Sequence, residues 1–210
     1  MTRHILVHGL GQNAGSWDTV RSLIGGERMF DAPELPRLLA DRAVSYENLY
    51  RAFEHYCNAF EEPLCLGGLS LGGVLAMHYG IEHPEKVQAL VLMATQFSMP
   101  KKLLAFQDLM FRFMPETAFR DIGFGKEDFI HLCKTMGALD FSDRLGGVSC
   151  PVLVLCGGKD KANLSASKAL AQRLPNARLQ VIPGSGHELN TQAPEALSRA
   201  LEDFYQEYRL

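Results

Sequence analysis

A serine with glycine on both sides is the first feature of this chain with a clear chemical use. The stretch Pro63–Gly73 contains Gly68-x-Ser70-x-Gly72, the G-x-S-x-G spacing of a nucleophile elbow. An elbow holds its serine on a strained turn between a strand and a helix, where side chains two residues away would collide. Because glycine has no Cβ, Gly68 and Gly72 would let this turn close. We therefore predict that Ser70 is a nucleophile; a glycine-rich connection with an incidental serine is the alternative.

A serine nucleophile needs a general base and a carboxylate that orients the base. Downstream of Ser70, one strand-like run leads into Gly157-Gly158-Lys159-Asp160, and another leads into Gly184-Ser185-Gly186-His187. On an elbow fold, the expected order along the chain is serine, then acid, then histidine. Asp160 and His187 follow that order. We predict that His187 is the general base and that Asp160 orients it.

The oxyanion formed during acyl transfer needs two backbone N–H donors. On an elbow fold one donor is the residue after the nucleophile, which here is Leu71. The other comes from the loop after an early strand, where this chain has His8-Gly9-Leu10. We predict that the N–H groups of Leu71 and Leu10 form the oxyanion hole. The side chain of His8 is expected to brace the loop.

Two alternatives concern the acid and the glycine-rich loop. Asp140 and Asp143 could supply the carboxylate in place of Asp160. Gly9-x-Gly11-x-x-x-Gly15, with Asp31 twenty residues after Gly11, is close to a dinucleotide-binding fingerprint. Its spacing is one residue longer than G-x-G-x-x-G, and a dinucleotide site would leave the ordered serine, acid and histidine unexplained. We expect no cofactor and no metal.

Strand-like and helical patterns alternate along most of the chain, as in a parallel sheet with helices on both faces. Strands are predicted at His4–His8, Arg28–Ala32, Leu64–Leu66, Val87–Ala94, Val152–Cys156 and Leu179–Ile182. Helices are predicted at Asn13–Ile24, Tyr46–Phe60, Val74–Ile81, Ser165–Leu174 and Pro194–Tyr208. Pro33 and Pro36 predict an extended loop after the second strand. The carboxyl ends of the strands would gather Ser70, Asp160 and His187 at one edge of the sheet.

Residues 96–149 interrupt this alternation with a long segment of helical pattern that is rich in Phe and Met. We therefore divide the chain into a core, residues 1–95 and 150–210, and a helical cap or lid, residues 96–149. Some of the cap's apolar side chains are predicted to line a substrate pocket. The alternative is an insertion that only buries its aromatic residues against the sheet.

Composition limits the classes of protein to which this chain can belong. It has 210 residues, 47% of them hydrophobic, and a net charge of −3, which is ordinary for a globular domain and gives no basic surface for nucleic acid or anionic membrane. The five cysteines show no C-x-x-C spacing, and Cys65 and Cys156 fall in predicted buried strands, so free thiols are expected. No apolar run is long enough for a membrane span. The first strand begins almost at Met1, so we expect no signal peptide and a cytoplasmic location.

Four local patterns together resemble the α/β-hydrolase superfamily. They are His8-Gly9-x-Gly11 through Trp17, Gly68-x-Ser70-x-Gly72-Gly73, Gly157-x-x-Asp160 and Gly186-His187. The resemblance covers nearly the whole chain and implies a six-stranded, mostly parallel sheet in the order 2-1-3-4-5-6. The first two strands that are usual in the family would be missing, and residues 96–149 match the position of its cap. The resemblance also implies that Ser70, His187 and Asp160 form a triad.

The function predicted from these residues is that of a serine hydrolase. Its substrate would be a small molecule, a carboxylic ester or thioester with an apolar acyl or aryl group, cleaved through an acyl-enzyme on Ser70. Two alternatives stay open. The same triad on this fold also serves lyase and perhydrolase chemistry, and a hydrolase scaffold can act as a ligand-binding receptor.

Overall fold

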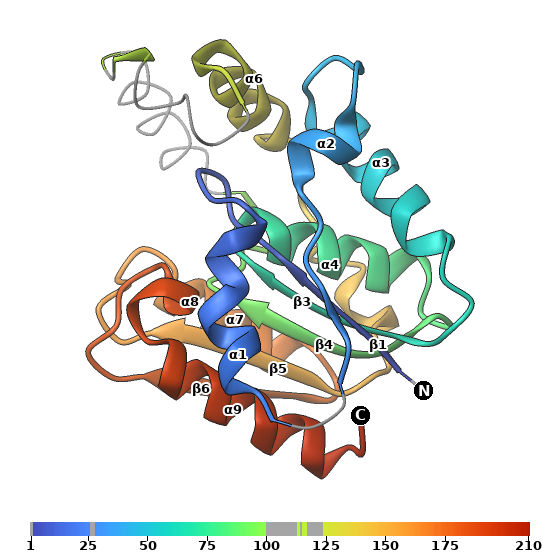
Figure 1. Ribbon diagram of the computed structural model, residues 1–210, viewed down its shortest axis with the longest axis vertical. Coiled ribbons are helices and arrows are strands. Elements are labelled where there is room, and N and C mark those ends of the chain that lie inside the picture. The colour runs from blue at the N-terminus through green and yellow to red at the C-terminus, as the bar shows by residue number, and fades with distance from the viewer. Residues whose placement is uncertain (1, 26–27, 100–112, 114, 117–123) are drawn as a thin grey trace.

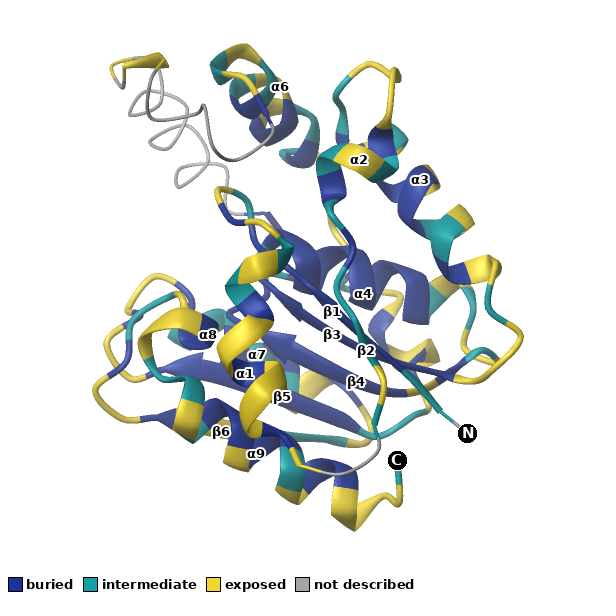
Figure 2. Ribbon diagram, viewed as in Figure 1, coloured by how far each residue is buried: buried dark blue, intermediate teal, exposed yellow. Residues whose placement is uncertain are grey.

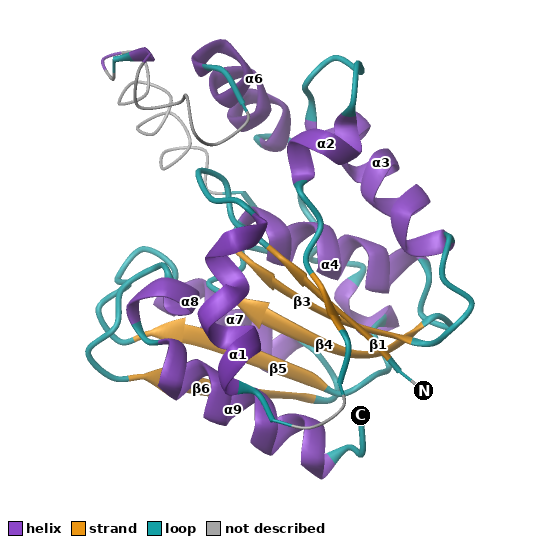
Figure 3. Ribbon diagram, in the orientation of Figure 1, coloured by secondary structure: helices purple, strands orange, loops and turns teal. Residues whose placement is uncertain are grey.

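A single sheet of six parallel strands lies at the centre of the molecule, with helices packed on both faces (Figure 1, Figure 3). The structure is a computed structural model that describes residues 2–25, 28–99, 113, 115–116 and 124–210. The strands are β1 (Arg3–Val7), β2 (Phe30–Asp31), β3 (Leu64–Leu69), β4 (Val87–Met93), β5 (Val152–Gly157) and β6 (Ala177–Ile182). Their order in the sheet is β2-β1-β3-β4-β5-β6, which confirms the predicted fold class and strand order.

The central strands bury side chains on both faces because consecutive residues of a strand point in opposite directions. In β4, Leu90 and Leu92 join one apolar cluster, while Val91 and Met93 join the cluster on the other face. The strands β1, β3, β4 and β5 are accordingly buried along almost their whole length, and they are dark blue in Figure 2. This double burial explains why their sequences read as apolar runs without polar alternation.

The helices fall into two groups according to the face that they cover. The helices and 3-10 helices are η1 (Ala14–Trp17), α1 (Asp18–Leu23), α2 (Leu35–Leu39), α3 (Tyr46–Asn58), α4 (Leu71–Glu82), α6 (Lys126–Met136), η3 (Leu145–Gly147), α7 (Leu164–Arg173), α8 (Leu189–Gln192) and α9 (Pro194–Glu207). Apolar side chains of α1, α8 and α9 pack on one face, and those of α3, α4, α6 and α7 pack on the other. Among the described residues, no helix is long and apolar enough to cross a membrane.

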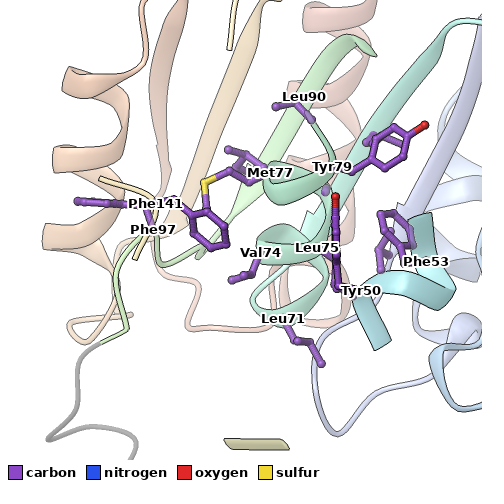
Figure 4. Close-up of a cluster of buried hydrophobic side chains, with 14 of the residues drawn as sticks. Tyr50, Phe53, Leu71, Val74, Leu75, Met77, Tyr79, Leu90, Phe97 and Phe141 are labelled. Carbon is purple, nitrogen blue, oxygen red and sulfur yellow. The ribbon is translucent and has the colours of Figure 1, made fainter. Parts of the chain in front are cut away.

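The helix α4 is the most deeply buried helix of the described structure and follows the predicted nucleophile directly. Its residues from Leu71 to Gly80 are all buried. Figure 4 shows why: side chains such as Leu75 and Met77 lie in an apolar cluster with Tyr50 and Phe53 of α3 and with Leu90 of β4. A helix that is apolar on all sides requires such an enclosed position. The start of α4 is therefore held firmly by the core.

Three local predictions differ from the structure. Pro33 and Pro36 were expected to keep their segment extended; Glu34 is extended, but the prediction is wrong at Pro36, which lies in the first turn of α2, where a missing N–H removes no helical hydrogen bond. The second strand is only Phe30–Asp31, shorter than the predicted Arg28–Ala32. The short helix α8 was not predicted.

The described part of residues 96–149 packs against the core. Its two ends are joined by backbone hydrogen bonds, from Met99 N–H to Leu139 O at 3.0 Å and from Phe141 N–H to Phe97 O at 2.8 Å. Apolar side chains between these ends, such as Phe129 of α6, belong to the same cluster as α3 and α4. Residues 100–112, 114 and 117–123, which include the cap residues Phe106, Met110, Phe111, Met114 and Phe119, lie outside the described residues.

Candidate active site

The turn between β3 and α4 has the geometry of a nucleophile elbow. Ser70 has φ 53° and ψ −113°, a backbone conformation that residues other than glycine rarely adopt. A Cβ on Gly68 would lie 2.2 Å from the backbone of Gly72, and a Cβ on Gly72 would lie 2.2 Å from the Val7 carbonyl oxygen. Both contacts are with backbone atoms, so no side-chain movement could relieve them. The turn closes only because both positions are glycine.

The Ser70 hydroxyl is not engaged in hydrogen bonds with the described residues around it. Its backbone N–H donates to Met93 O at 2.8 Å, but its hydroxyl does not cap α4. Within the described residues the hydroxyl makes no hydrogen bond, and this includes His187. No group in that part of the chain therefore competes for the oxygen.

The two predicted oxyanion donors lie on elements that touch each other. The close approach of Gly72 to Val7 and to the His8 carbonyl packs the start of α4 against the end of β1, where the Leu10 loop begins. Within the described residues, neither the Leu10 N–H nor the Leu71 N–H donates to another protein group. Both donors are therefore available, and the Leu71 donor lies at the positive end of a helix.

The buried His8 ring fixes the direction of the Leu10 N–H. Leu35 N–H donates to His8 Nε2 at 3.2 Å, so Nε2 is the unprotonated nitrogen and Nδ1–H donates to the Gly9 carbonyl at 2.9 Å. The Gly9 C=O and the Leu10 N–H belong to one planar trans peptide and point in opposite directions. The Leu10 N–H therefore points away from the ring. Burial holds the pKa of His8 below its ordinary value, although the Gly9 carbonyl and Glu34 oppose the shift, and this favours the neutral ring.

The predicted base and acid meet at the adjacent ends of β5 and β6. His187 Nδ1 lies 2.8 Å from Asp160 Oδ2, and the Lys159 N–H donates to Ser185 O at 2.8 Å and ties the two turns together. Asp160 is buried, whereas the His187 side chain is 42% exposed. Burial by itself raises the pKa of Asp160, but hydrogen bonds from His187 and Asn163 outweigh it, and the pKa lies below its usual value. The carboxylate thus stays ionised and can orient the imidazole.

Asn163 holds this carboxylate and Gln96 in turn holds Asn163; neither amide was predicted from the sequence. Asn163 Nδ2 lies 3.0 Å from Asp160 Oδ1, 2.9 Å from Asp160 Oδ2 and 3.2 Å from His187 Nδ1. Because Nδ1 carries the proton donated to Asp160, the last contact is a close approach and not a hydrogen bond. Gln96 Nε2 donates to Asn163 Oδ1 at 2.8 Å and so orients the amide. Gln96 follows the carboxyl end of β4, at the same sheet edge as Ser70 and Asp160. This position could have identified Gln96 as a candidate from the sequence.

The other acids and the dinucleotide pattern have different surroundings. Asp140 accepts hydrogen bonds from the N–H and hydroxyl of Ser142. Asp31 pairs with Arg3 at 3.2 Å. Among the described residues, the carboxylate that contacts His187 is therefore that of Asp160, and not that of Asp140 or Asp143.

One group of described residues has the spacing of metal ligands. Ligand atoms of Glu54, Glu82 and His83 lie within 4.8 Å of one another. Arg51 already pairs with Glu54 at 3.0 Å, and Arg144 pairs with Glu82 at 3.3 Å. Glu82 and Ser70 lie at opposite ends of α4, so this cluster has no part in the site.

An open groove lies beside the amides that hold Asp160. It has a volume of about 470 Å³ and is bounded by the residues after β4 and by α7. Its lining residues are Gln96, Phe97, Ser98, Ala162, Ser165, Ala166 and Ala169. The groove is mostly apolar, with Gln96 connecting it to the Asn163–Asp160 pair.

Comparison with known proteins gives a consistent family. The profile of a family described as "Alpha/beta hydrolase family" matches residues 5–200. A pimeloyl-[acyl-carrier protein] methyl ester esterase of Nitrosomonas europaea is 25% identical over 228 aligned positions, which cover 91% of this chain and 90% of that protein. For other curated relatives the match is shorter and covers as little as 25% of the relative's length. These findings support an enzyme that hydrolyses esters.

Solved structures share the fold at low sequence identity. MenH from S. aureus has a TM-score of 0.81 at 14% identity, over 99% of this chain and 95% of that one. A thermophilic esterase from Thermogutta terrifontis has a TM-score of 0.75 at 21% identity, over 100% of this chain and 91% of that one. At such identities the likeness establishes the fold alone.

Proposed function

Because this chain belongs to the α/β hydrolase family, we propose that it is a serine hydrolase that cleaves carboxylic esters or thioesters with an apolar acyl or aryl group. The observation that carries the proposal is the 2.8 Å contact between His187 Nδ1 and Asp160 Oδ2 at the sheet edge where Ser70 occupies its elbow. That contact leaves Nε2 as the basic nitrogen of His187. The ester named in the Nitrosomonas relative supports the same bond type.

In the proposed mechanism, His187 Nε2 takes the proton of Ser70 as the hydroxyl oxygen attacks the carbonyl carbon. Asp160 stabilises the imidazolium that forms. The N–H groups of Leu10 and Leu71 donate to the oxyanion, and His187 returns the proton to the leaving alcohol or thiol. Water, activated by His187, then attacks the acyl-enzyme and releases the acid and Ser70.

The mostly apolar lining of the groove beside Gln96 supports an apolar group on the substrate. We propose accordingly that the ligand is a small molecule. Ester hydrolysis needs no metal or redox cofactor, because the triad and the oxyanion donors supply every proton transfer and charge contact that it requires.

The test is a panel of 4-nitrophenyl esters of increasing chain length, measured with the wild type and with Ser70→Ala. We expect turnover that rises with chain length and is lost in Ser70→Ala, while the melting temperature stays close to that of the wild type. A fluorophosphonate should label Ser70 in the wild type and fail to label it in His187→Ala. Full ester turnover by Ser70→Ala, or ligand binding without any turnover, would overturn the proposal.

A further inference from the structure

A pair of buried amides joins the loop of the proposed oxyanion donor to the turn of the proposed base. Gln12 Nε2 donates to Asn190 Oδ1 at 3.1 Å, and Asn190 Nδ2 donates back to Gln12 Oε1 at 3.1 Å. Both side chains are buried, Gln12 at 7% and Asn190 at 1% exposure. The residues are 178 positions apart in the sequence, so this pair links two segments that the sheet alone does not connect.

Gln12 forms hydrogen bonds with the peptide groups next to Leu10. Its backbone N–H donates to Gly9 O at 3.2 Å, and its side-chain Oε1 accepts from Gly9 N–H at 3.4 Å. Gly9 O also accepts from His8 Nδ1–H, as described above. Both peptide groups of Gly9 are thereby held, and the second of them carries the Leu10 N–H.

Asn190 belongs to the segment that follows the base. It lies in α8, and the N–H of its neighbour Leu189 donates to His187 O at 3.1 Å. Its Nδ2 also donates to Ser16 O at 3.2 Å. The Gly9 N–H needs an acceptor and Ser16 O needs a donor, so these contacts fix which atom of each amide is oxygen and which is nitrogen. The pair therefore has one arrangement, with its donors and acceptors matched.

We propose that Gln12 and Asn190 are positioning residues whose paired amides fix the position of the Leu10 N–H relative to the His187 ring. The inference rests on the proposed function, because it assigns roles in that reaction to the two ends that the pair connects. A displacement of about 1 Å at a reacting group can lower a rate roughly 100-fold. A buried amide pair is suited to prevent this, because breaking it leaves polar groups unsatisfied.

The first test compares single variants with a swapped pair. Gln12→Ala and Asn190→Ala should each lower kcat for a 4-nitrophenyl ester roughly 10- to 100-fold, with KM little changed. The double variant should be no worse than the poorer single variant. Gln12→Asn combined with Asn190→Gln keeps the total length of the two side chains and should recover most of the activity that either exchange loses alone.

The control away from the site is the exposed amide variant Asn176→Ala. Asn176 Nδ2 donates to Ser149 O at 2.7 Å before β5 and β6 begin, at the sheet edge opposite the site. Because Asn176 is exposed, this variant should change stability little and keep the kcat of the wild type. The inference is overturned if the Gln12 and Asn190 variants behave as this control does, or if their effects on kcat multiply in the double variant.

Backbone hydrogen exchange of the unliganded protein tests the coupling between the two segments without any substrate. In Gln12→Ala, protection should fall both in residues 9–16 and in residues 186–192, whereas exchange that changes only in residues 9–16 overturns the inference. If the wild type has no Ser70-dependent turnover, the proposed function fails, and the exchange measurement still decides whether the pair couples the two segments.

Discussion

The two halves of the candidate site are held in place by different means. The serine half is held by backbone close packing: Ser70 has a positive φ, and Gly72 has no room for a Cβ beside Val7. The acid–base half is held by side-chain hydrogen bonds among Asp160, Asn163 and Gln96. A clash with backbone atoms cannot be relieved by moving a side chain. The loss of one hydrogen bond, by contrast, leaves the other hydrogen bonds of the chain in place. We therefore expect mutations in the serine half to abolish folding or activity, and mutations in the polar half to have graded effects.

The largest effect is predicted for Gly72→Ala. The new Cβ would lie 2.2 Å from Val7 O and 2.7 Å from His8 O, so the end of β1 and the elbow must separate. We expect a loss of about 3 kcal/mol in the free energy of unfolding, the upper end of the usual cost of overpacking, together with loss of ester turnover. Denaturant unfolding and 4-nitrophenyl ester assays measure the two quantities.

The control for this prediction is Gly146→Ala. A Cβ at Gly146 would have no atom of the described residues within 4 Å, and Gly146 is exposed. The free energy of unfolding should stay within about 0.5 kcal/mol of the wild-type value. A folded and active Gly72→Ala protein would show that the serine half can relax, which would remove the contrast between the two halves.

The second prediction contrasts two histidine rings, one held by packing and one by hydrogen bonds. His4 is buried between Phe30 and Tyr205 and its Nδ1 has no hydrogen-bond partner among the described residues, whereas Nδ1 of His187 contacts Asp160. Burial, with a smaller contribution from Arg28, lowers the pKa of His4 from 6.5 to about 4. Between these two values the unfolded chain binds a proton that the folded protein does not bind. Stability is therefore complete above pH 6.5 and falls as the pH drops toward 4.

The expected loss from His4 across that window is about 3 kcal/mol, since each unit of pKa shift corresponds to about 1.4 kcal/mol. His4→Phe removes the titrating group and breaks no hydrogen bond within the described part of the chain, so the stability of this variant should fall less steeply with decreasing pH. The comparison is urea unfolding of both proteins at pH 7.5 and pH 4.5. If both proteins lose the same free energy of unfolding between these pH values, protonation of His4 does not destabilise the folded protein, and the prediction is wrong.

The contrast also explains what the sequence could predict. Gly68 has a local cause, because a Cβ there would collide with the backbone of Gly72, whereas a Cβ on Gly72 would collide with Val7, which is distant in the sequence. The spacing of both glycines around Ser70 is nevertheless visible as a short motif, and the apolar strands follow from burial on both faces. The order of serine, acid and histidine then indicates one sheet edge. All of these features can be read from short windows of sequence.

The polar supports could not be predicted in this way. Gln96 lies 67 positions from Asn163, and Gln12 lies 178 positions from Asn190, so each pair depends on the final arrangement of strands. An amide residue in a loop gives no periodic signal that would identify its partner. The short helix α2 was missed for a different reason: a proline suggests extended backbone unless it is known to lie in a first turn.

Asn163→Ala tests the graded behaviour of the polar half. It removes the hydrogen bonds from Nδ2 to both oxygens of Asp160 but leaves the carboxylate and His187 in place. We expect kcat to fall about 10-fold, in the range of one hydrogen bond to a charged group, with KM little changed. Asn48→Ala is the control, because Asn48 Nδ2 also donates a 2.8 Å hydrogen bond, to Ala43 O, away from the site. A complete loss of activity in Asn163→Ala would show that the polar half is as intolerant as the serine half.

The smallest effect is expected for Gln96→Ala, because Gln96 reaches the carboxylate only through Asn163. Its single 2.8 Å hydrogen bond orients the Asn163 amide, which still has Asp160 as its acceptor after the change. We expect a fall in kcat of roughly 3-fold, corresponding to less than about 1 kcal/mol. In an Asn163→Ala background the same substitution should have no further effect, because the amide that Gln96 orients is gone. A double-mutant cycle measures this coupling. Independent effects of the two substitutions would mean that Gln96 acts on the site by another route, for example through the groove that it lines.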